Sequence, residues 1–256
     1  MLTGIFDSHA HYDDAAYQED RDPLLSSLPE RGVCRVLNVG CDIETSFRSA
    51  ALAEQYPFFY AAAGVHPEMA AEVSGDWLEG ISALLDREKV VAIGEIGLDY
   101  HYDTPSREVQ QEVFEAQLEL AVRKRLPVII HSRDAMEDTF ALLREYRPEG
   151  VLHCFSGSAE SAKEAVRLGL YLGFTGVLTF KNARRALEAV EAVPADRLLL
   201  EADCPYMAPE PFRGKRCTSD LIAYTAEAMA GIKGVSPQEM IDQARRNANR
   251  LFRLPD

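Results

Sequence analysis

Short runs of β-branched and apolar residues recur along the whole chain, each followed by a polar stretch and a segment with helical spacing. The clearest helical segment spans 106–125, where Val109, Val113 and Leu120 repeat at helical intervals between charged residues. Alternation of strand and helix is typical of a parallel sheet. The strand-like runs lie at residues 4–9, 33–39, 58–65, 90–95, 127–131, 150–154, 170–174 and 197–201. Eight such units predict an α/β protein of the (β/α)8, or TIM barrel, class.

The last part of the chain carries clear loop and helix signals. Residues 204–216 contain three prolines and one glycine, which predict a long ordered loop after the eighth strand. Ser236 offers an N-cap, Pro237 occupies the first helical position and Glu239 completes a capping box, so we expect a helix that ends near Phe252. The sequence shows no internal repeat and no linker, and we expect a single domain over residues 1–256.

Composition and charge narrow the function classes. The chain has 41 acidic residues against 27 Lys plus Arg, a net charge of −14, which excludes nucleic-acid binding through a broad basic surface. A polyanionic substrate would have to be bound locally, at a strand end. The chain has neither a basic leader nor an apolar run of about 18 residues, so we expect no membrane contact. The five cysteines form no CxxC pair, which favours reduced thiols in a cytoplasmic protein. We predict no stable protein partner.

Histidines and carboxylates gather where the predicted strands end. In a barrel these positions meet at the carboxyl-end rim, which carries the catalytic groups. Imidazole and carboxylate are ligands that divalent transition metals accept. A single histidine there is more often a satisfied polar residue, and a single carboxylate is often a helix N-cap. The concentration of so many on one rim favours a metal site; the set is His9, His11, His66, Glu95, His131, His153 and Asp203.

The number of candidate ligands predicts two ions. An open catalytic zinc usually keeps about three protein ligands, whereas a pair of ions about 3.5–4 Å apart shares a larger set. A metal-activated hydroxide would be the nucleophile, and Asp203 would accept its proton as general base. Asp7 shares a predicted strand face with His9, and we expect it to orient an imidazole. The assignment is His9, His11 and Asp203 for one ion, His131 and His153 for the other, and Glu95 as the bridge.

The same stretches resemble the successive signatures of the TatD-like metal-dependent hydrolases. The resemblance extends to Asn247 and Phe252 and implies a metal-bearing (β/α)8 barrel similar to the amidohydrolase superfamily. It implies the same ligand scheme, and removal of nucleotides from the 3′ end of single-stranded DNA, or RNA in some members. It also implies a phosphate-side or catalytic role for His66 beside Glu95 and Asp203. The stretches are FDSHAH (6–11), GVHP (64–67), GEIGLDY (94–100), PVIIHSR (127–133), HCFSG (153–157) and EADCP (201–205), with Gln110, Phe114 and Gln117.

Two positions depart from the family pattern. Ala202 stands where members usually have threonine, and Cys217, Thr218 and Ser219 replace the usual Asn-Glu-Pro or Asn-His-Pro. The ligand Asp203 is kept, so we expect a tuned metal site. The second departure affects whatever the asparagine contributes to substrate positioning.

A phosphodiester suits a two-metal site, because both ions neutralise charge on the attacking and leaving oxygens. We expect His66, Arg133, Lys181 and Arg213 to contact the substrate, with Lys215 and Arg216 nearby, although each cation alone is more often a solvated surface charge. Four imidazoles favour Zn²⁺ or Mn²⁺, and Mg²⁺ is often supplied to family members. Exposed bases would stack on aromatic side chains of the rim loops; the candidates are Tyr100, Tyr102, Phe155, Phe180, Tyr206 and Phe212.

The chief alternative is a hydrolase of small amides, esters or phosphoesters on the same barrel. Many such enzymes bridge their metals with a modified lysine after the fourth strand, where this chain has Glu95 and no lysine between Lys89 and Lys124. An aminoacyl-tRNA deacylase would use the same site. A non-catalytic metal-binding scaffold is a further alternative, against which the complete ligand set argues.

Overall fold

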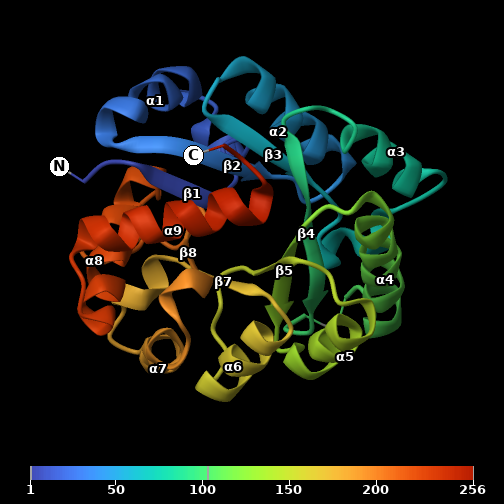
Figure 1. The fold of residues 1–256 in the computed structure, drawn as a ribbon. Coiled ribbons are helices and arrows are strands. Elements are labelled where there is room, and N and C mark those ends of the chain that lie inside the picture. Colours follow the sequence, from blue (N-terminus) through green and yellow to red (C-terminus); the bar gives the residue numbers. More distant parts are fainter. Residues whose placement is uncertain (1, 103, 256) are drawn as a thin grey trace.

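The computed structural model describes residues 2–102 and 104–255, and these residues form the predicted (β/α)8 barrel. Eight parallel strands follow one another in chain order around the barrel, and helices surround them (Figure 1). An isolated bridge between Ala10 and Cys204 joins the end of the last strand to the first. Next to it, the backbone N–H of Asp203 donates to the carbonyl of His9 at 2.9 Å. This junction brings two candidate metal ligands side by side.

The strands are β1 (Ile5–Ala10), β2 (Val33–Val39), β3 (Phe59–Ala63), β4 (Val90–Asp99), β5 (Val128–Arg133), β6 (Gly150–Leu152), β7 (Tyr171–Phe174) and β8 (Leu198–Leu200). The α-helices are α1 (Arg21–Ser27), α2 (Ile43–Gln55), α3 (Trp77–Leu84), α4 (Arg107–Lys124), α5 (Met136–Tyr146), α6 (Ala159–Arg167), α7 (Arg184–Ala192), α8 (Ile222–Lys233) and α9 (Pro237–Phe252). Short 3-10 turns are η1 (Ala15–Tyr17), η2 (Pro29–Arg31), η3 (Pro67–Glu72), η4 (Gly176–Thr179), η5 (Ala195–Arg197) and η6 (Ser219–Leu221). Each predicted strand coincides with an observed one to within a few residues, apart from β4, which continues to Asp99.

The helix and loop signals at the end of the chain are confirmed. The Ser236 side chain accepts from the backbone N–H of Glu239, the Glu239 side chain completes the capping box, and α9 ends at Phe252. Residues 205–216 form an irregular segment after β8. Among the helices of the described ranges, none is both long and apolar enough to cross a bilayer.

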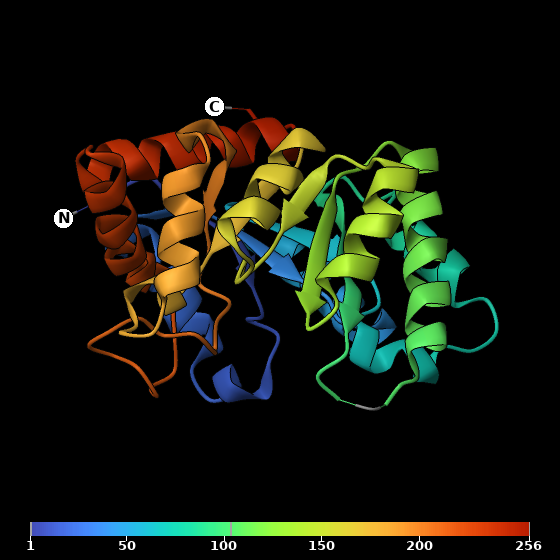
Figure 2. The same ribbon diagram turned by 90° about the horizontal axis from the view of Figure 1, so that it is seen from below.

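The two ends of the barrel differ in chemistry. Helix α9 lies across one end, whereas the loops that follow the strands lie at the other (Figure 2). Leu251 and Phe252 of α9 belong to the apolar cluster that fills the barrel interior, together with Phe6 and Ile129. The rings of Phe6 and Phe252 lie 6.2 Å apart. One end is therefore closed by apolar packing, and the polar groups collect at the opposite rim.

Candidate metal centre

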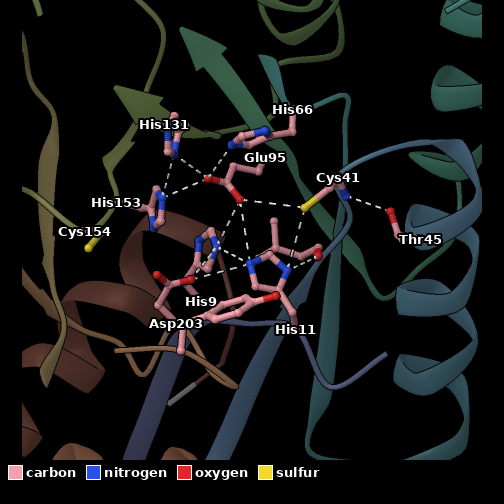
Figure 3. A network of polar contacts seen from close by, with 12 residues as sticks. His9, His11, Cys41, Thr45, His66, Glu95, His131, His153, Cys154 and Asp203 are labelled. Carbon is pink, nitrogen blue, oxygen red and sulfur yellow. Dashed lines mark hydrogen bonds and ion pairs between the residues drawn. The ribbon is translucent and has the colours of Figure 1, made fainter. Parts of the chain in front are cut away.

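The six side chains expected to bind metal converge at the carboxyl ends of the strands (Figure 3). They come from five different strands, so only the closed barrel brings them together. His9 lies in β1, Glu95 in β4 and His131 in β5. His11 and His153 directly follow β1 and β6, and Asp203 lies three residues after the end of β8. The geometry matches the expected gathering, while metal binding by these residues stays a prediction.

The first group of ligand atoms lies around His9. Its Nε2 is 3.0 Å from Nε2 of His11, and Asp203 Oδ1 lies 3.8 Å and 3.6 Å from these two nitrogens. One oxygen of Glu95, Oε2, lies 3.4 Å from the His9 nitrogen and 3.7 Å from that of His11. Two imidazole nitrogens and two carboxylate oxygens thus face one another, which is a donor set for a divalent transition metal.

The second group lies around the other oxygen of Glu95. His153 Nε2 is 2.8 Å and His131 Nδ1 is 3.0 Å from Glu95 Oε1. The two nitrogens are 3.4 Å apart. Each oxygen of this carboxylate therefore faces its own pair of imidazoles, as a bridging ligand would.

Two of the candidate ligands, Glu95 and His9, have pKa shifts that suit metal binding, whereas neighbouring acidic groups raise the pKa values of His11, His131 and His153 despite burial. Burial raises the pKa of Glu95, but His153, His66 and His9 and the hydrogen bond with His131 lower it more, and hold it well below its usual range. Burial and the neighbouring His153 lower the pKa of His9. Metals bind ionised carboxylates and neutral imidazoles, and the cluster favours these forms on Glu95 and His9.

The outward nitrogens of three of the four imidazoles have polar neighbours, whereas the buried Nδ1 of His9 has no hydrogen-bond partner among the described residues. His131 Nε2 lies 2.9 Å from the Asp99 Oδ2, and His11 Nδ1 lies 2.9 Å from the carbonyl oxygen of Val39. His153 Nδ1 is 3.5 Å from Oε1 of Glu201, an ion-pair distance too long for a good hydrogen bond. Outer partners of this kind set the orientation of a ligating ring and raise its basicity.

Asp99 and Glu201 were given no role by the sequence analysis. A signal was present for both: Asp99 is four residues after Glu95 on the same strand, and Glu201 is two residues before Asp203. Residues an even number apart on a strand share a face, so each carboxylate belongs to the rim. Which imidazole each one meets depends on ring orientation, which sequence spacing does not specify.

The expectation that Asp7 orients an imidazole is wrong. Its carboxylate accepts hydrogen bonds from the backbone N–H groups of His9 and Ala202 and from the Ser219 hydroxyl. The register between β1 and β2 shifts between Asp7 and Ala10, which breaks the alternation on which the prediction relied. Asp7 instead ties β1 to the segment after β8.

His66 lies beside the bridging carboxylate. Its Nδ1 accepts from the backbone N–H of Glu68 at 3.2 Å, so its Nε2 carries the proton in the neutral ring. That nitrogen is 3.6 Å from Glu95 Oε1. Burial lowers the pKa of His66 to about 4. The side chain is therefore a neutral N–H donor at the edge of the ligand cluster.

A cavity of about 950 Å³ opens over the cluster. Arg133, Tyr102, Phe155 and Tyr206 line it, as does Cys41, whose sulfur is 4.0 Å from Glu95 Oε2. Among the other residues expected to contact substrate or bases, Lys181 is exposed at the turn after η4 and is not part of this lining. Arg213 and Phe180 line an adjoining hollow. Tyr100 hydrogen-bonds Asp138, and Phe212 packs against Tyr224.

The two departures from the family pattern contact each other. The Cys217 thiol lies 3.7 Å from the carbonyl oxygen of Ala202, and both residues are buried. Tyr17 donates a hydrogen bond to the backbone carbonyl of Cys217. These substitutions therefore change packing behind the rim segment that carries Asp203.

A (β/α)8 barrel with clustered imidazoles and carboxylates at its rim has the architecture of a metal-dependent hydrolase. Comparison with known proteins identifies the family. The sequence profile described as TatD related DNase matches residues 6–253. The chain is 44% identical over 253 residues to the uncharacterized metal-dependent hydrolase YabD of Bacillus subtilis, covering 98% of this chain and 99% of that protein. The chain belongs to the TatD family of metal-dependent hydrolases.

Other relatives agree with this assignment. The 3′-5′ ssDNA/RNA exonuclease TatD of Erwinia billingiae is 34% identical over 262 residues, with 98% of this chain and 100% of that protein covered. The crystal structure of YjjV, a TatD homolog from Escherichia coli, superposes with a TM-score of 0.93 at 33% identity over the full length of both chains.

Proposed function

We propose that this protein is a two-metal phosphodiesterase that removes nucleotides from the 3′ end of single-stranded DNA. The observation that carries the proposal is the position of Glu95, whose two oxygens each face a separate pair of imidazoles, at 3.4 and 3.7 Å and at 2.8 and 3.0 Å. The E. billingiae relative named an exonuclease supports the choice of substrate. RNA is the nearest alternative substrate.

The ligand assignment in this proposal is the one given by the two groups of atoms. His9, His11 and Asp203 would hold one ion, His131 and His153 would hold the other, and Glu95 would be shared by both. The four imidazoles favour Zn²⁺ or Mn²⁺ over Mg²⁺. When bound, such ions supply positive charge at phosphate oxygens and acidify water.

The chain's own groups then have distinct tasks. Asp203 accepts the proton of the attacking water. The hydrogen bond with His11 and the neighbouring imidazoles lower the pKa of Asp203 despite burial, so its carboxylate is ionised and able to take up a proton. His66 donates its Nε2–H to a phosphate oxygen, and Arg133 at the cavity wall adds charge on the same group. A cavity of about 950 Å³ admits a strand terminus rather than a duplex.

The test is a digestion of 5′-labelled single strands that carry either a free or a blocked 3′ end, in Zn²⁺, Mn²⁺ or Mg²⁺. We expect stepwise shortening of the free strand only. Glu95→Gln should abolish it while the protein stays folded; Glu68→Gln, at the cavity wall outside the ligand groups, is the matched control. Release of product from amide, ester or aminoacyl-tRNA substrates, with no cleavage of oligonucleotides, would overturn the proposal.

A further inference from the structure

Two hollows adjoin the active-site cavity, and they differ in available charge. One of about 450 Å³ shares Asp13, Ala15 and Arg48 with the cavity. Its cations are already engaged, because Arg48 pairs with Glu44 and Arg21 donates to three backbone carbonyls. This hollow offers no unpaired cation to a phosphate.

The other hollow, of about 550 Å³, shares Asp14, Tyr206 and Met207 with the cavity. Its lining residues come from the segment after β1, from Phe180 after η4 and from the segment after β8. These segments lie at the same end of the barrel as the other loops that follow the strands (Figure 2). We call it the Arg213 groove, after one of its exposed cations. Arg213 and Lys215 form no ion pair with any residue in the described ranges, whereas Arg216 is held by Asp20 through both guanidinium nitrogens. In a chain of net charge −14, two cations of one hollow that have no carboxylate partner among the described residues mark a place for anions.

Aromatic rings stand beside these cations. The Arg213 guanidinium lies over the ring of Phe180 at 4.3 Å. Tyr206, at the border of the two hollows, is 57% exposed, and its hydroxyl donates to Asp14 Oδ2 at 3.3 Å. An exposed ring held by its hydroxyl is a platform on which a base stacks with little loss of side-chain freedom.

We propose that the Arg213 groove binds the nucleotides that precede the 3′-terminal nucleotide of a single strand. With the terminus at the metal centre, the next base stacks on Tyr206, and the following two phosphates meet Arg213 and Lys215. Cationic grooves lined with aromatic rings are the usual means of binding single strands without reading their sequence. The inference rests on the proposed nuclease function, because that function places the terminus in the cavity.

The experiment measures binding without cleavage. The probe is 5′-fluorescein-(dT)12 with phosphorothioate linkages at its 3′ end, titrated with Mn²⁺-loaded protein and followed by fluorescence anisotropy between 50 and 300 mM salt. Each phosphate contact on a single strand contributes about −0.7 to the slope of log K against log salt. The double variant R213Q/K215Q should therefore have a slope shallower by about 1.4, and Tyr206→Ala should bind at least about fivefold more weakly.

The matched control is K163Q/R250Q, which removes two exposed cations that line neither hollow. It should keep the wild-type slope, and equal melting temperatures should confirm that all variants are folded. Wild-type slope and affinity in R213Q/K215Q would overturn the groove proposal, even if the enzyme cleaves DNA. If R213Q/K215Q weakens binding but the wild-type protein does not cleave an unmodified strand, the groove proposal is supported and the proposed nuclease function is overturned.

Discussion

Asp99 allows a test of the metal centre that leaves every proposed ligand in place. It is 2% exposed, its Oδ2 lies 2.9 Å from Nε2 of His131, and its Oδ1 accepts from the backbone N–H of His101. His131 turns its other nitrogen toward Glu95, so Asp99 fixes both the orientation and the protonated nitrogen of the ring. Asp99→Asn keeps the size of the side chain and removes its charge.

The expected effect follows from the role of such partners. Loss of an outer partner of a ligating histidine typically weakens metal binding about 10–100-fold. A tenfold change is about 1.4 kcal/mol, so we expect the binding free energy to weaken by about 1.4–2.8 kcal/mol. Only one of the two proposed ions should be affected, because His131 belongs to only one of the two groups of candidate ligands.

Competition of Zn²⁺ between the protein and a chromophoric chelator yields both dissociation constants. The matched control is Asp138→Asn in α5, which removes the same charge from a carboxylate that bonds Tyr100 and Gln111 instead of an imidazole. The argument about Asp99 would be refuted if D99N kept both wild-type dissociation constants for Zn²⁺. It would also be refuted if D138N lost as much Zn²⁺ affinity as D99N.

Two further predictions concern the surroundings of the centre. Gly173→Ala places a Cβ 2.1 Å from Glu201 Oε2 and must displace that carboxylate, which lies beside His153. The ion assigned to His131 and His153 should therefore bind more weakly in the chelator titration. Gly231→Ala, where an added Cβ has open space, should leave both constants unchanged. Burial raises the pKa of Asp7 from 3.8 to about 7, so folding favours its neutral form and wild-type stability falls as pH rises from about 4 to 7. The amide side chain introduced by Asp7→Asn does not titrate, so the unfolding free energy of the variant minus that of the wild type should increase by roughly 4 kcal/mol over this pH range. Urea titrations of the metal-free proteins measure this difference. A difference that does not change with pH would contradict the argument that burial keeps the Asp7 carboxyl neutral.

Much of the fold was predictable because its signals are local. Apolar runs that alternate with segments of helical spacing predicted the eight strands. The start of α9 was predicted from its capping box and first-turn proline, which are Ser236, Glu239 and Pro237. The gathering of histidines was also predictable, since parallel strands in a barrel all end at one rim. The extent of β4 was not predicted, because GEIGLD carries two glycines that read as a loop. The structure shows why one is needed: Gly97 has φ +143°, and a Cβ there would lie 2.0 Å from the carbonyl oxygen of His131.

The details that the sequence left open are those set by register and ring orientation. Strand alternation placed Asp7 beside the His9 imidazole, and a register shift turned its carboxylate to the backbone instead. Asp99 and Glu201 reach their imidazoles only because those rings adopt particular orientations. Lys181 follows β7 as expected but remains exposed to solvent, since loop direction is not fixed by position along the chain.

The contact of α9 with the barrel interior has a consequence for how the protein is made. Phe6 is synthesised long before Phe252, yet the two rings pack against each other. His9 likewise meets Asp203 only after β8 has been translated. The full ligand cluster can therefore form only after Asp203, which follows the last strand, has been synthesised. Assembly of the candidate metal centre is thus tied to closure of the barrel rather than to any single βα unit.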